Sequence, residues 1–63
     1  MFRLYYFFNF DSASLIFENN DLGPCLAFIR HNHYVPTRCT IISPNNRRIT
    51  FDVNNDLVFA GLN

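Results

Sequence analysis

The sequence is poor in charge, and it contains no lysine, glutamine or tryptophan. Charged residues make up 16% of the chain, against about 25% in an average soluble domain. Five basic side chains balance five acidic ones, so the formal net charge is zero. This balance predicts no strongly basic surface for DNA or anionic lipid. With only two glycines, the chain also lacks a glycine-rich loop that cradles phosphate.

The length of 63 residues limits what the chain can enclose. A domain of this size buries only about 60% of the surface that its unfolded form exposes, and ligand pockets commonly need about 300–1,000 Å³. We therefore expect one small domain over residues 1–63, no enzymatic activity and no cofactor. The opening residues 1–8 lack a small-residue cleavage site, and no apolar run approaches about 20 residues. We expect neither signal peptide nor membrane span, which favours an intracellular protein or a component of an assembled particle.

Hydrophobic residues are abundant, at 49% of the chain, and eight of them are phenylalanine. This composition predicts a folded or assembled chain rather than a disordered one. Polar and apolar residues alternate over residues 48–53, as in a half-buried strand. The polar residues 54–56 then predict a three-residue loop to a strand at 57–60. This loop would pair Val53 with Leu57 and Phe51 with Phe59.

A second turn is predicted at residues 44–46, because Pro44 presets its own φ and asparagine tolerates the left-handed conformation. This turn sets a register in which apolar residues face apolar residues and opposite charges face each other across the two strands. The facing pairs are Arg38 with Asp52, Cys39 with Phe51, Thr40 with Thr50, and Ile41 with Ile49. Residues 37–60 are therefore predicted to form a three-stranded antiparallel meander.

The first ten residues alternate loosely, with Phe8 and Phe10 on the same predicted side as Leu4. Their aromatic content favours a strand, and residues 15–17 can return beside it as a hairpin. The alternative is a short helix capped by Asp11 or Ser12.

The segment from residue 22 onward shows helical spacing of its apolar residues. A cap at Asp21 or Gly23 and Pro24 in the first turn support a helix that ends before Tyr34. A buried strand over residues 25–30 is the alternative. The apolar stripe consists of Leu22, Cys25, Leu26 and Ile29. The sequence thus predicts an α+β fold in which an N-terminal hairpin, one short helix and the C-terminal meander follow in the order ββαβββ. The alternative is a small all-β barrel.

Four potential zinc ligands, Cys25, His31, His33 and Cys39, are arranged symmetrically about Asn32. In a hairpin the cysteine pair would lie roughly 20 Å from the histidine pair, at about 3.3 Å per residue. Zinc needs four ligands within about 2.3 Å of one ion. We therefore expect no metal site. The two cysteines are expected to be reduced rather than joined in a disulfide.

These observations favour a small non-enzymatic protein that binds other proteins or itself, as a structural subunit, accessory component or inhibitor. Apolar residues on the second face of the sheet predict an interface centred on Tyr5, Phe7 and Val58. The alternative is a small β module that binds single-stranded nucleic acid. In that case aromatic side chains would stack on bases, and Arg3, Arg47 and Arg48 would contact phosphates.

Overall fold

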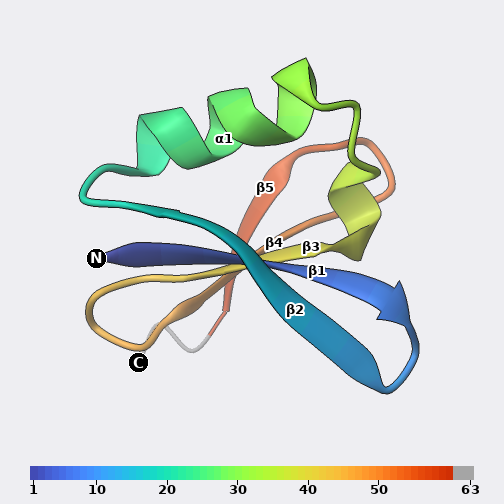
Figure 1. Cartoon of the computed structure of the whole chain (residues 1–63), viewed down its shortest axis with the longest axis horizontal. Helices are drawn as coiled ribbons and strands as arrows, with labels where there is room; N and C mark the ends of the chain where they lie inside the picture. The colour runs from blue at the N-terminus through green and yellow to red at the C-terminus, as the bar shows by residue number, and fades with distance from the viewer. Residues whose placement is uncertain (61–63) are drawn as a thin grey trace.

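The computed structural model describes residues 1–60 and shows an open five-stranded antiparallel sheet with one α-helix on one face (Figure 1). The elements are β1 (Phe2–Asn9), β2 (Ser12–Asn19), α1 (Leu22–His31), the short 3₁₀ helix η1 (Pro36–Arg38), β3 (Cys39–Ile42), β4 (Arg48–Phe51) and β5 (Leu57–Ala60). The spatial order of the strands is β2-β1-β3-β4-β5. The predicted ββαβββ order is confirmed, and the barrel alternative is wrong because β2 and β5 remain at separate edges.

The N-terminal hairpin is confirmed as two strands, so the alternative of a capped helix is wrong. The turn is tight, since β2 already begins at Ser12. The Asp11 backbone N–H donates to Asn9 Oδ1 over 3.2 Å, a local contact that favours a turn over a helix. An irregularity between Leu4 and Tyr5 places Ile16 outside the regular pairing of the two strands.

Helix α1 confirms the helix predicted from residue 22 onward, so the alternative of a strand over residues 25–30 is wrong. Asp21 is the extended N-cap residue, and Pro24 is tolerated because the first N–H groups of a helix need no intrahelical acceptor. At the other end His33 adopts a left-handed φ of 59°. The N–H of His33 donates to the Arg30 carbonyl and that of Tyr34 to the Ile29 carbonyl, which is the Schellman pattern of helix termination.

The turn between β3 and β4 follows the sequence prediction. Thr40 faces Thr50 and Ile41 faces Ile49, and Asn46 takes the left-handed conformation with φ 62°. The predicted start of the strand at residue 37 is wrong, because Pro36–Arg38 forms η1. The Arg38 N–H donates to the Val35 carbonyl there, so Arg38 does not face Asp52 across a ladder.

The register of β4 and β5 differs by two residues from the prediction. Phe51 faces Leu57 and Ile49 faces Phe59, whereas the sequence predicted Phe51 opposite Phe59. The side chain of Asp52 explains the difference, since its Oδ1 accepts the N–H groups of Asn54 and Asp56 over 2.9 and 3.0 Å. These bonds close a longer loop over residues 52–56 and leave Val53, predicted to pair with Leu57, 88% exposed within it.

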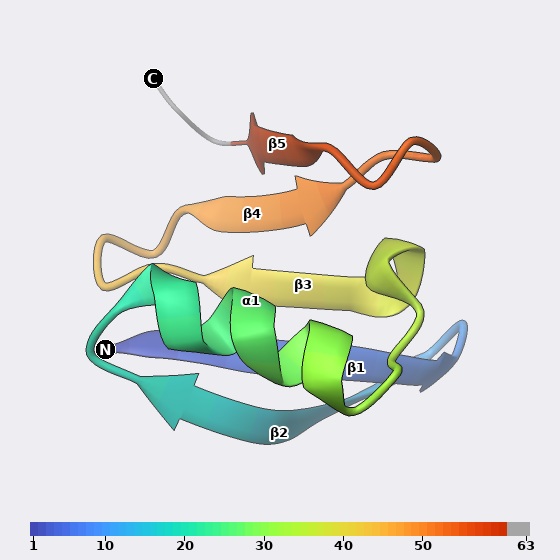
Figure 2. The same ribbon diagram turned by 90° about the horizontal axis from the view of Figure 1, so that it is seen from above.

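The core lies between α1 and the strands beneath it. The buried residues are Leu4, Tyr6, Cys25, Ile29, Cys39, Ile41 and Ile49. Register places Leu4, Ile41 and Ile49 side by side on β1, β3 and β4. Helix α1 packs on β1 and β2, toward one side of the sheet, and is farthest from β5 (Figure 2). Within residues 1–60, no helix has the length and apolar character required to cross a membrane.

Candidate binding surfaces

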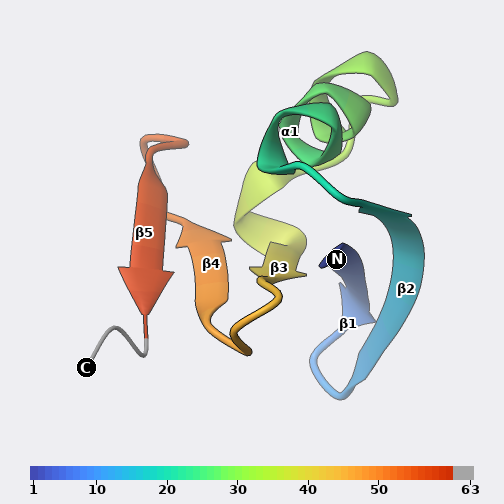
Figure 3. The same cartoon turned by 90° about the vertical axis from the view of Figure 1, so that its left-hand side faces the viewer.

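The face of the sheet opposite α1, here called the open face, is covered by no element of the described chain (Figure 3). Successive side chains of a strand point to opposite faces. Leu4 and Tyr6 are buried in the core, so Tyr5 between them points to the open face. The same alternation applies along the neighbouring strands.

A single row of residues crosses the open face in register on all five strands. From edge to edge the row consists of Leu15, Tyr5, Thr40, Thr50 and Val58. Leu15 and Val58 at its two ends are 48% and 42% exposed. The three residues between them are half-buried. The row is uncharged, with aliphatic residues at its two ends and hydroxyl-bearing side chains at the three positions between them.

The structure brings the predicted interface residues Tyr5, Phe7 and Val58 to this one face, although they are not all neighbours. Phe7 lies two residues beyond Tyr5 on β1 and is 37% exposed. Val58 lies on β5, three strands away from Tyr5. Leu15 directly faces Tyr5 and was missed, because the irregularity in β2 is not visible in the sequence pattern.

Two of the three predicted phosphate-binding arginines also lie on the open face. Register aligns Arg3, Ile42 and Arg48 in the row next to Tyr5. Arg3 pairs with Glu18 across the hairpin, with 3.5 Å between Nε and Oε2. Arg47 lies in the turn before β4, where its N–H donates to Ser43 Oγ over 3.0 Å.

Both cysteines are buried and unbonded to each other. The Cys39 Sγ donates to the Val35 carbonyl over 3.4 Å, and burial raises the pKa of this thiol from 9.0 to about 11. Burial also raises the pKa of Cys25. Both thiols are therefore neutral packing groups at neutral pH. His31 and His33 are exposed, and residues 1–60 contain no group of three or more histidine, cysteine, aspartate or glutamate side chains able to hold a metal ion.

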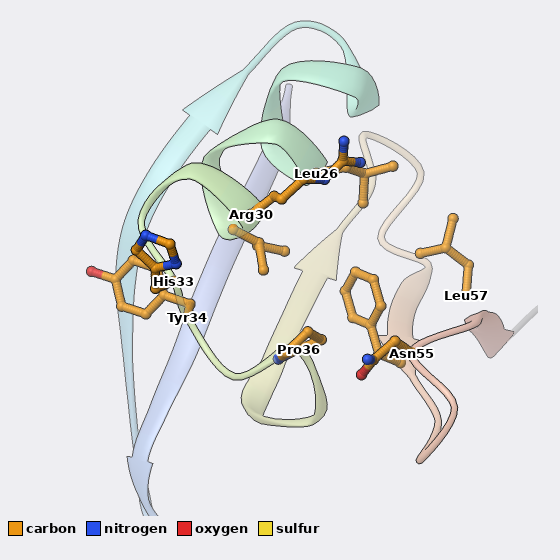
Figure 4. Close-up of a pocket in the computed structure, with 9 residues that line it drawn as sticks. Leu26, Arg30, His33, Tyr34, Pro36, Asn55 and Leu57 are labelled. Carbon is orange, nitrogen blue, oxygen red and sulfur yellow. The ribbon is translucent and has the colours of Figure 1, made fainter.

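A groove of about 630 Å³ lies on the other side of the sheet, between α1 and the β4–β5 hairpin (Figure 4). It forms because α1 packs toward β1 and β2. Leu26 on α1 and Leu57 on β5 lie on opposite sides of this space. The residues that line the groove are Leu26, Ile29, Arg30, His33, Tyr34, Pro36, Phe51, Asn55 and Leu57. Sequence reasoning missed this groove, since helical spacing does not tell where a helix lies across a sheet.

The end of the β1–β2 hairpin projects beyond the rest of the sheet. Pairing of β1 with β3 ends at Tyr6 and Cys39, so the residues beyond Tyr6 pair only with β2. Phe8 is 54% exposed and Phe10 is fully exposed. The sequence pattern placed both on the buried side with Leu4, but the structure leaves Phe10 without cover, and Phe8 contacts the core only through the edge of Tyr6, at 5.0 Å between ring centroids.

Comparison with known proteins gave no match: no family model, no curated protein and no solved structure resembles this chain significantly. The surfaces that can indicate a function are therefore those of the structure itself: the open face, the groove and the projecting hairpin.

Proposed function

We propose that this protein is a small non-enzymatic binding protein that contacts a protein partner, or another copy of itself, through the open face of its sheet. The observation that carries the proposal is the uncharged row from Leu15 to Val58, with Phe7 beside it. A solvated face of an antiparallel sheet is normally polar. The exposed apolar side chains on this uncovered face, Phe7, Leu15 and Val58, are typical of a surface that binds another protein.

The arrangement of polar groups supports the same function. Aromatic residues are enriched in the cores of protein interfaces, and charged residues are depleted there. Tyr5 lies in the middle of β1 and Phe7 nearer its end, while Arg3, Glu18 and Arg48 lie in the row on the other side of Tyr5. The open face thus has an aromatic region bordered on one side by charges. The formal net charge of zero gives little repulsion between copies or against a neutral partner.

The test places a charge in this region without disturbing the core. Phe7→Asp is expected to abolish binding through the open face, because burial of an unpaired carboxylate at an interface is strongly unfavourable. Asn45→Asp adds the same charge in the exposed turn before β4 and serves as the matched control. The measurement is molar mass in solution at micromolar concentration, together with the proteins retained by each tagged variant from a native extract. A folded monomer that retains no partner, and is indifferent to Phe7→Asp, would refute the proposal.

A second candidate function is binding of single-stranded nucleic acid. It is favoured by one observation, the placement of Arg3 and Arg48 on the same face as Tyr5. Aromatic side chains stack on bases, and such binding weakens strongly with salt. A salt-sensitive affinity for single-stranded oligonucleotides that is lost in the Arg47→Ala/Arg48→Ala double variant would favour this function over protein binding.

A further inference from the structure

The tip of the β1–β2 hairpin carries an exposed apolar side chain, Phe10, and an exposed carboxylate, Asp11, on consecutive residues. Among residues 1–58, Phe10 is the one large hydrophobic residue that is fully exposed. Asp11 is exposed as well, and its N–H is held by Asn9 Oδ1. The tip is a short turn, and its exposed Phe10 ring offers about 150–250 Å² of aromatic surface.

The groove offers the complementary chemistry. Its apolar lining comes from three elements: Leu26 on α1, Phe51 on β4 and Leu57 on β5. These side chains are only partly buried, so they retain apolar surface for an occupant. The volume of about 630 Å³ lies within the range of ordinary ligand pockets and exceeds what one aromatic side chain requires.

The one permanent charge in the lining of the groove is positive. Arg30 is the only permanently charged residue that lines the groove. The one ion pair found within residues 1–60 joins Arg3 to Glu18, so the Arg30 guanidinium has no carboxylate partner there. A carboxylate that enters the groove next to an apolar group would meet a charge-assisted hydrogen-bond donor.

We propose that the hairpin tip of one copy binds in the groove of a second copy, with Phe10 against Leu57 and the Asp11 carboxylate at Arg30. The occupant is a second copy because the tip carries the apolar and anionic groups that the groove selects. It is not the same copy, because Phe10 is fully exposed in its own chain and does not line the groove. The contact is head-to-tail, so repetition gives a ring or a filament. This contact rests on the proposed binding function and adds a second interface, made by surfaces other than the open face.

The first experiment measures self-association by sedimentation up to millimolar concentration. A contact this small is weak, with a dissociation constant expected between about 1 µM and about 1 mM. Phe10→Ser removes the aromatic group and is expected to weaken association by about 30-fold. Asp11→Arg and Arg30→Asp should each weaken it, and the double variant Asp11→Arg/Arg30→Asp should recover association because the two charges are exchanged. All three positions are exposed, so the fold is retained.

The second experiment mixes two defective chains. Phe10→Ser keeps its groove, and Arg30→Glu keeps its tip. Each alone is expected to remain monomeric under conditions where the parent forms larger species, whereas the mixture should form a 1:1 dimer and nothing larger. In a heteronuclear NMR spectrum of labelled Phe10→Ser, addition of unlabelled Arg30→Glu should shift the amide signals of Asn55 and Leu57 beside the groove.

The outcomes separate this proposal from the one for the open face. A parent that stays monomeric at millimolar concentration, or a Phe10→Ser variant that associates like the parent, overturns the tip-in-groove contact. Loss of all binding in Phe7→Asp with no effect of Phe10→Ser overturns the tip contact and leaves the open-face function standing. Head-to-tail association that persists in Phe7→Asp, while partner binding also persists, supports the tip contact and overturns the open-face function.

Discussion

The strongest quantitative prediction compares the same substitution at two leucines on neighbouring strands. Leu4 on β1 is fully buried in the core, whereas Leu15 on β2 is 48% exposed on the open face. Removing a core leucine side chain costs about 2–5 kcal/mol, because the transfer energy is lost and a cavity remains. At Leu15 water fills the space, so the cost is limited to part of the transfer energy, about 1 kcal/mol.

The consequence is large because the chain is small. A domain of this length has a total stability of only about 3–5 kcal/mol. Leu4→Ala is therefore expected to lose most of its stability at 25 °C, and Leu15→Ala should stay folded with a slightly lower midpoint. Urea titration followed by far-ultraviolet circular dichroism, at a protein concentration low enough to prevent association, measures both. Equal losses of stability in the two variants would refute the assignment of Leu4 to the core and Leu15 to the open face.

Two further predictions concern single side chains. The folded pKa of Cys39, about 11, lies above its ordinary value of 9.0, so the folded state binds more protons than the unfolded state between these pH values. The free energy of unfolding should therefore fall as pH rises from about 9 to about 11. Urea titrations at each pH should show this fall in the parent and not in Cys39→Ala. His33 holds a left-handed φ of 59° at the end of α1, so His33→Gly should raise the stability by about 1 kcal/mol in thermal unfolding. A decrease in the melting temperature of His33→Gly would show that the imidazole contributes more than the backbone conformation costs.

The sequence predicted those elements whose signals are local. The turn before β4 was correct, because Pro44 and Asn46 carry their own conformational preferences and Asn46 does take φ 62°. The register of Ile41 with Ile49 followed from that turn. The loop after β4 was predicted too short, because Asp52 binds the backbone of Asn54 and Asp56. Sequence pattern alone does not show which of several polar residues will form such bonds.

The sequence by itself therefore determined the order of elements and the helical face with Cys25 and Ile29, since these depend on periodicity and on turn residues. Only the tertiary structure decided what lies above each strand. The alternation of the first strand is the same at Leu4 and at Phe8, yet Leu4 is buried and Phe8 is 54% exposed. The reason is that β3 pairs with β1 only as far as Tyr6. Burial depends on where neighbouring elements end, and the same is true of the groove that α1 leaves beside β4 and β5.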